Sequence, residues 1–62
     1  MPVQFKQLPA EVQPIVAAGW YAVVYKGIQV YGVFSQHILA VGYISAIAGP
    51  EDRLLFEIVG CV

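Results

Sequence analysis

Two sets of residues alternate along 21–34: Tyr21, Val23 and Tyr25 alternate with Ala22 and Val24, and beyond the next two residues Ile28, Val30 and Phe34 alternate with Gln29, Tyr31 and Val33. A period of two is that of a β-strand. Two strands are predicted, one over 21–25 and the other over 28–34. Lys26 and Gly27 lie between them and supply the turn, because glycine tolerates the left-handed conformations that tight hairpins need. The pattern therefore predicts an antiparallel hairpin in this part of the chain.

The segment before the hairpin predicts a helix over residues 8–18. Pro9 suits the first helical turn, where its missing N–H costs no hydrogen bond, and Glu11 places a negative charge near the positive end of the helix dipole. Gly19 is a stop signal. Pro14 would lie inside such a helix, so we expect either a kink or a short helix that restarts near Pro14.

Residues 38–48 form a long apolar run that we interpret as a strand or a pair of strands with two apolar faces. A turn is predicted at 49–52, where Gly-Pro-Glu-Asp occurs, and a last strand over 54–58. Glycines in and beside these strands favour strong bending of the sheet. The expected fold is one domain, 1–62, with a short N-terminal helix and a β meander over 20–60 that closes into a small bent antiparallel barrel of SH3-like or Sm-like type.

Charged side chains are scarce in a way that changes this picture. They make up 11% of the 62 residues, whereas a soluble domain carries about a quarter. The chain is 60% hydrophobic with a mean hydropathy of +0.74, and Lys26 is the only charged residue from Val12 to Pro50. So small a domain buries little surface by itself. We therefore expect a homo-oligomer, with an interface at Leu39, Val41, Tyr43 and Ile47.

A membrane protein fits the sequence less well than an oligomer does. A membrane-spanning helix needs about 20 predominantly apolar residues, and the least unfavourable candidate, 27–48, would place several polar side chains in lipid. The first residues carry no signal-peptide pattern, so a cytoplasmic protein without membrane contact is expected. Cys61 is the only cysteine, which excludes a disulfide within one chain. No metal site or cofactor is predicted.

Residues 25–34, with the sequence YKGIQVYGVF, resemble the first motif of the Sm, LSm and Hfq proteins, in which a turn glycine and a second glycine frame alternating apolar residues. Residues 43–47 resemble the short second motif. The resemblance implies a bent five-stranded barrel that assembles into a ring and binds RNA near the pore. The Asp and Asn that the family carries after the second glycine have no counterpart in residues 35–37.

On this basis Lys26, Tyr31 and His37 are the candidate residues for binding RNA or single-stranded DNA. They lie at or near predicted turns, and aromatic rings beside cations are how proteins bind unpaired bases. With a net charge of −1, one cation per subunit must be multiplied by symmetry to attract a phosphate backbone. The alternative is a structural or protein-interaction subunit that binds no nucleic acid.

An enzymatic function is not predicted. The start Met-Pro resembles that of the small tautomerases, where removal of the methionine leaves Pro2 as an amino-terminal base. That family holds acidic substrates with arginines, and Arg53 is the only arginine here. No catalytic residue is therefore assigned.

Overall fold

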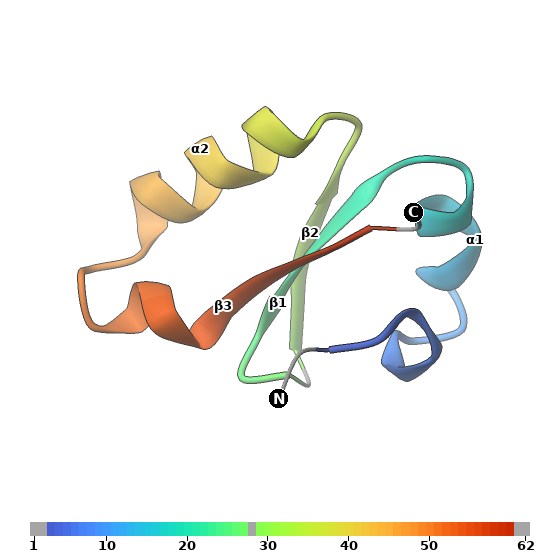
Figure 1. Cartoon of the computed structure of the whole chain (residues 1–62), viewed down its shortest axis with the longest axis horizontal. Coiled ribbons are helices and arrows are strands. Elements are labelled where there is room, and N and C mark those ends of the chain that lie inside the picture. The colour runs from blue at the N-terminus through green and yellow to red at the C-terminus, as the bar shows by residue number, and fades with distance from the viewer. Residues whose placement is uncertain (1–2, 28, 61–62) are drawn as a thin grey trace.

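The computed structural model describes residues 3–27 and 29–60, which form a three-stranded sheet with helices packed on it (Figure 1). Met1, Pro2, Ile28, Cys61 and Val62 lie outside the described residues, and with them the expectations for Pro2, Cys61 and the start of the second strand. The elements in chain order are the 3₁₀ helix η1 (Phe5–Gln7), α1 (Gln13–Ala17), β1 (Tyr21–Tyr25), β2 (Gln29–Phe34), α2 (His37–Ile47), the 3₁₀ helix η2 (Asp52–Leu55) and β3 (Phe56–Gly60).

The sheet is antiparallel and open, with the strand order β2-β1-β3. β1 pairs with both neighbours, so Val23 lies opposite Gly32 on one side and Ile58 on the other. β2 and β3 thus run in the same direction on either side of β1, and α2 lies in the crossover connection between them. The expected small antiparallel sheet preceded by a short N-terminal helix is confirmed, and a second helix, α2, lies within the segment expected to be strand. The expected meander over 20–60 is wrong, and the described strands leave β2 and β3 as free edges instead of closing a barrel.

The hairpin of β1 and β2 is confirmed. Lys26 and Gly27 form its turn with φ angles of 55° and 75°, the left-handed conformation that such turns use. The register shifts between Val23 and Val24, whose partners are Gly32 and Val30, so Tyr31 is the additional residue of a β-bulge. The bulge adds twist to β2.

Residues 38–48 are not a strand: α2 spans almost all of this segment. Its buried residues are Ala40 and Ile44, and Ala48 follows at the helix end, so they recur at every fourth position and form one helical stripe. The two small alanines let the helix approach the sheet closely. The pattern was misinterpreted because the positions between these residues are apolar as well, which hides the helical period.

The N-terminal helix is shorter than residues 8–18. Residues 9–12 form a turn in which the Pro9 carbonyl accepts hydrogen bonds from Val12 and Gln13. α1 then begins at Gln13, with Pro14 in its first turn, where its missing N–H leaves no bond unmade. Of the two expectations for Pro14, the restarted helix is therefore confirmed.

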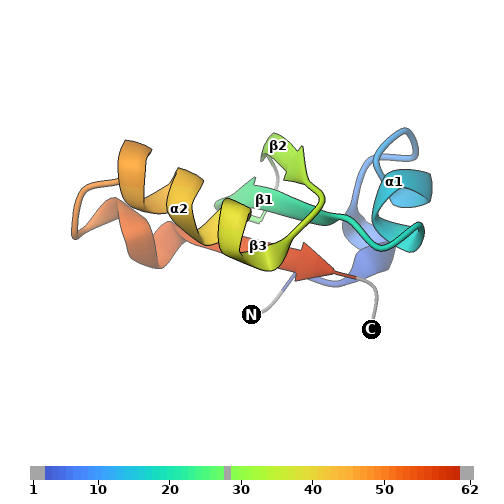
Figure 2. The same cartoon turned by 90° about the horizontal axis from the view of Figure 1, so that it is seen from above.

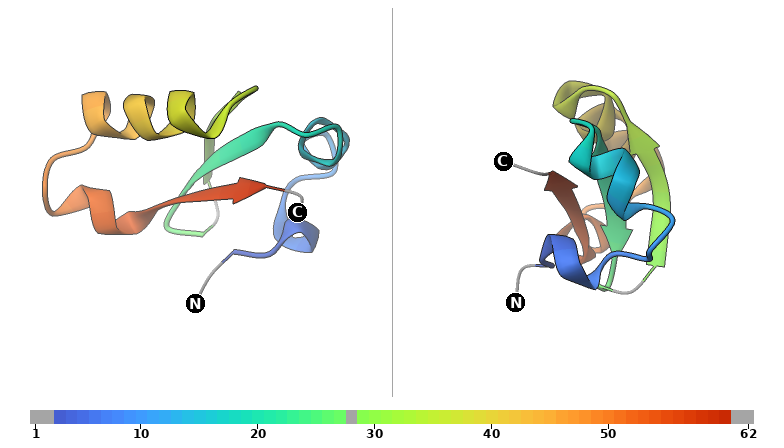
Figure 3. Two further views of the ribbon diagram at one scale, coloured as in Figure 1. Left: turned by 45° about the horizontal axis from the view of Figure 1, so that its top comes forward. Right: turned by 90° about the vertical axis from the view of Figure 1, so that its right-hand side faces the viewer.

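Two layers cover opposite faces of the sheet. α2 packs on Val23 and its same-face neighbours, whereas Ala22 and Val24, which point the other way, contact Leu8 and Val16 of the N-terminal segment. Figure 2 shows α2 and α1 near opposite ends of the molecule with the sheet between them, and the left view of Figure 3 also separates them. β1 is therefore buried on both faces within a single chain.

The last strand begins two residues later than expected. β3 starts at Phe56, and Leu54 belongs to η2, where the Arg53 N–H donates to the Gly49 carbonyl at 3.0 Å. Phe56 and Ile58 face α2 as the predicted alternation requires. A strand beginning at residue 54 would place Leu54 on the same face as Phe56 and Ile58. Leu54 is instead 89% exposed, because the turn of η2 removes it from the strand.

Candidate functional site

The outward face of α2 carries four of the nine exposed large hydrophobic side chains of the described residues. Residues 37–47 contain no Asp, Glu, Lys or Arg. Ile38 is 67% exposed and Leu39 49%, although both are large aliphatic side chains in a well-formed helix. A helix that is apolar all round is normally buried all round. The outer α2 face is defined here by its exposed residues, which are Ile38, Leu39, Val41, Gly42, Ser45, Ala46 and Ile47.

Three of the four residues predicted to form an interface lie on this surface. Leu39, Val41 and Ile47 are exposed apolar residues of α2, a helix where a strand was expected. Tyr43 is different, because its ring lies 5.1 Å from the ring of Phe34 and covers the sheet of its own chain. The interface itself stays a prediction.

Lys26 and Tyr31, predicted to bind nucleic acid, meet in one aromatic cluster. The Nζ atom of Lys26 lies 5.4 Å from the centre of the Tyr25 ring, and the rings of Tyr25 and Tyr31 are 5.5 Å apart. Phe56 completes the cluster at 4.7 Å from Tyr25 and 5.3 Å from Tyr31. A cation beside packed aromatic rings is thus present at this end of the hairpin.

His37 does not join this cluster. Its ring packs edge-on against Tyr21 at 5.5 Å, at the first residue of β1, whereas Tyr25 is the last residue of that strand. At about 3.3 Å per residue, the two ends of β1 lie about 13 Å apart. Within one chain, Lys26 and Tyr31 therefore lie in the same cluster, and His37 lies apart from them.

An acidic side chain lies near Lys26. Lys26 and Glu57 both line a shallow hollow of about 240 Å³ next to the hairpin turn. The Glu57 carboxylate accepts a hydrogen bond from the backbone N–H of Val3, which holds it in place. A fixed carboxylate repels phosphate, so the electrostatic attraction for nucleic acid at this site is weak within a single chain.

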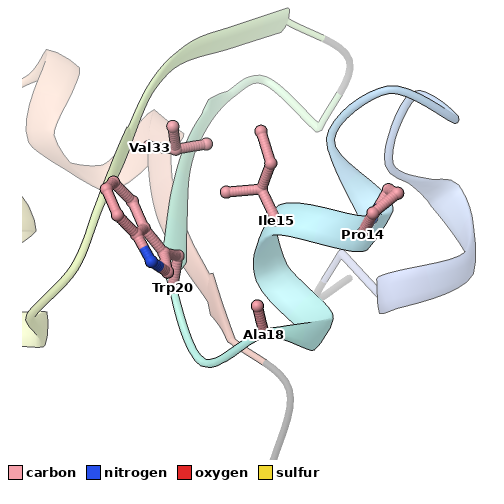
Figure 4. Close-up of a pocket in the computed structure, with 5 residues that line it drawn as sticks. All are labelled: Pro14, Ile15, Ala18, Trp20 and Val33. Carbon is pink, nitrogen blue, oxygen red and sulfur yellow. The ribbon is translucent and has the colours of Figure 1, made fainter.

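A second hollow, which sequence reasoning did not find, lies between α1 and β2. Its volume is about 430 Å³, and its wall consists of apolar side chains (Figure 4). Ile15, Trp20 and Val33 face the same space, and Trp20 is 42% exposed. We call this feature the Trp20 hollow; the residues that line it are Pro14, Ile15, Ala18, Trp20 and Val33.

The end of α1 positions Trp20 at this hollow. Gly19 has a φ of 109°, which side chains rarely tolerate, and its N–H donates to the Val16 carbonyl at 3.0 Å. The Trp20 N–H donates to the Ile15 carbonyl at 3.3 Å, completing a Schellman motif, in which the residue after the glycine packs on the last helical turn. The sequence signal was a glycine followed by a large apolar residue after a helix.

The described residues offer neither a cluster of three His, Cys, Asp or Glu side chains fit to bind a metal nor a helix long and apolar enough to cross a bilayer. Comparisons with protein-family models, with curated proteins and with solved structures find no significant match to this chain.

Proposed function

We propose that this protein is a structural interaction subunit that assembles with copies of itself through the outer α2 face. The observation that carries the proposal is a helix of 11 residues that has no charged side chain and leaves large aliphatic groups exposed. Exposed contiguous apolar surface of this kind is typical of sites where another molecule binds. The proposal is a binding role without catalysis.

A second copy is the partner that fits this face best. Two identical α2 helices meet without like charges, so no ion has to be desolvated or paired. Gly42 and Ser45 lie among the aliphatic side chains, and residues this small let two helix backbones approach closely. In an antiparallel pair the two helix dipoles are also oppositely oriented. These features support a two-fold dimer as the unit of assembly.

The decisive experiment introduces one negative charge on this face. Ile38→Asp is well suited, because Ile38 is exposed and a carboxylate in the first turn of a helix stabilises it. The variant is expected to keep its circular dichroism spectrum and to fall to the monomer mass in light scattering coupled to gel filtration. Gln29→Asp adds the same charge at an exposed position of β2 and is expected to assemble as the wild type does.

Two results contradict the proposal. Wild-type protein that stays at the monomer mass of 6.8 kDa at micromolar concentration leaves no assembly to explain. If Ile38→Asp assembles as well as the wild type, the interface lies elsewhere on the surface. Binding of the wild type to lipid vesicles in place of self-association would assign the face to a membrane surface instead.

Binding of single-stranded nucleic acid is the second candidate, favoured by the contact of Lys26 with the Tyr25 ring and of that ring with Tyr31. The test is the fluorescence anisotropy of a short labelled RNA at low salt. Lys26→Gly is the best variant, because φ at this position is 55° and glycine adopts that conformation without strain. Weaker binding and a flatter salt dependence in Lys26→Gly support this function. Equal binding by Lys26→Gly and the wild type, or no binding by either, contradicts it.

A further inference from the structure

β2 has an outer edge at which its backbone makes no hydrogen bond to any described residue. The strand order β2-β1-β3 leaves β2 paired with β1 on one side only. On its other side, residues 29–34 neither donate nor accept a hydrogen bond within the described part of the chain. Figure 2 shows β2 bordering the sheet between α2 and α1. Such an edge is a template on which another extended chain can pair.

The side chains of β2 do not protect this edge. Proteins commonly protect edge strands with charged residues or prolines, and residues 29–34, with the sequence QVYGVF, contain neither. The opposite edge strand, β3, differs, because it carries the charged Glu57, whose carboxylate accepts the Val3 N–H. β2 is therefore the edge of the sheet that is open to a further strand.

Apolar side chains flank the β2 edge on both faces of the sheet. Val33 lies opposite Ala22, on the face that the N-terminal segment covers, and there it lines the Trp20 hollow. Tyr31 lies towards the other face, where its ring is 5.3 Å from that of Phe56. Trp20 and Tyr31 are each 42% exposed. A strand added at this edge would contact both surfaces, because its side chains alternate between the two faces.

We propose that an extended, uncharged peptide segment of a partner protein adds to β2 as a fourth strand and places an apolar side chain in the Trp20 hollow. The backbone edge selects an extended chain, since a strand repeats its donors and acceptors at the matching spacing. The hollow, with a volume of about 430 Å³ and an apolar wall, accommodates a side chain of the size of leucine.

The charges at the site determine the polarity of this peptide. Neither β2 nor the wall of the Trp20 hollow contains a charged side chain. A charged residue of the partner would therefore lose its hydration without gaining an opposite charge. An apolar residue gains burial there and also covers the exposed ring of Trp20.

β2 of a second copy fits this edge less well than a peptide does. The β-bulge at Tyr31 twists the strand, and a flexible peptide can follow that twist, whereas a second β2 brings a bulge of its own. The Trp20 hollow and the outer α2 face also lie on opposite sides of the sheet. Peptide binding is therefore independent of the self-association proposed above.

The test uses Trp20, the only tryptophan of the chain, as a probe of the hollow. The ligand is a capped peptide of seven residues, with threonine at the odd positions and valine, leucine and valine at the even ones. Trp20 emission is expected to shift to shorter wavelength as this peptide is added, equally in the wild type and in Ile38→Asp. Glycine in place of the leucine should raise the dissociation constant by about tenfold to a hundredfold. No shift at millimolar peptide contradicts the proposal.

Two N-methylated peptides test the backbone pairing. One carries methyl groups on the amide nitrogens of the threonines and the other on those of the apolar residues. Because successive N–H groups of a strand point to opposite edges, only one of the two sets faces β2. One peptide is expected to lose binding by more than about tenfold, and the other to bind within a few-fold of the unmethylated peptide. Equal binding by the two methylated peptides contradicts strand addition.

Two lysine variants of the protein test the hollow. Ala18→Lys places a long cationic side chain among the residues that line it, and Ala17→Lys adds the same charge at the neighbouring exposed position, which does not line it. A cation at the end of α1 is favourable for the helix in both variants. Ala18→Lys is expected to weaken peptide binding by about tenfold or more, and Ala17→Lys by less than about twofold. Equal binding by the two variants would place the peptide outside the hollow.

Amide hydrogen exchange followed by NMR distinguishes the peptide from other occupants. Saturating peptide is expected to slow the exchange of at least one amide among residues 32–34. An emission shift without slower exchange would mean that the peptide fills the hollow and adds no strand, which contradicts the proposal. If these amides are already protected in peptide-free Ile38→Asp, and that variant has the mass of a dimer, a second copy occupies the edge and the peptide is the wrong partner.

Discussion

β1 and α2 are the two most apolar elements of the molecule, and they differ in how much of each the chain covers by itself. β1 lies between two strands and two helical layers, so Ala22, Val23 and Val24 are buried in succession. α2 buries Ala40 and Ile44 against the sheet and leaves its other side exposed. The apolar composition of an element thus indicates how much of its surface must be shielded from water. It does not indicate whether the same chain or another molecule provides that shielding.

The largest expected effect comes from a charge in β1. Val23→Asp would bury a carboxylate that has no partner between the sheet and α2, at a cost of several kcal/mol. Stability for a chain of 62 residues is only about 3 to 9 kcal/mol, at roughly 0.05 to 0.15 kcal/mol per residue. The variant is expected to lose its folded circular dichroism spectrum at 25 °C.

The same charge on α2 provides the matched control for that experiment. Ile38→Asp is expected to remain folded and lose only assembly, because Ile38 is exposed in a single chain. If Val23→Asp and Ile38→Asp both unfold, the outer face of α2 is buried in the assembled wild type as fully as β1 is. The chain would then fold only when it assembles with a second copy. If both remain folded, the packing described for β1 is wrong.

The contrast between β1 and α2 also explains which elements could be predicted from the sequence. The hairpin was predicted because its alternation and its Lys26-Gly27 turn are local signals. α2 was missed because its outward face is as apolar as its inward face, so the helical period does not appear. Its length of 11 residues was the remaining evidence for a helix, since strands usually have four to eight.

The candidate site was predictable only in part, for similar reasons. Tyr25, Lys26 and Tyr31 come together because the hairpin joins them locally. His37 lies apart, since β2 carries the chain back to the other end of β1 before α2 begins. The contact of Phe56 with the same cluster depends on the pairing of β3 with β1, which no local pattern indicates.

A smaller effect separates folding from assembly at a single position of α2. No atom lies within 4 Å of the place that a Cβ atom would occupy at Gly42. Gly42→Ala is therefore expected to stabilise the monomer by about 1 kcal/mol, the difference between the helix propensities of the two residues. In the Ile38→Asp background, which removes assembly, thermal or urea unfolding measures that gain alone. A loss of stability there would show that α2 is not helical at this position.

In the wild-type background the added methyl group should also separate two paired helices slightly. The association constant of Gly42→Ala is expected to fall by a few-fold while its unfolding midpoint at low concentration rises. Changes in the same direction for both quantities would indicate that Gly42 lies outside the interface.

Cross-linking through the outer α2 face tests the central claim most directly. Ser45→Cys changes one oxygen to sulfur at an exposed position of α2, and replacement of Cys61 by serine makes the new thiol the only one. In an antiparallel pair centred on Gly42, the midpoint of α2, the two Cα atoms at position 45 lie about 9 Å apart along the helices and about 12 Å apart in total. A bifunctional maleimide reagent that spans this distance is expected to give a covalent dimer of twice the 6.8 kDa chain mass, whereas Gln29→Cys in the same background should remain monomeric on a denaturing gel. Equal cross-linking at both positions, or none at position 45 in protein that light scattering shows to be associated, would contradict assembly through this face.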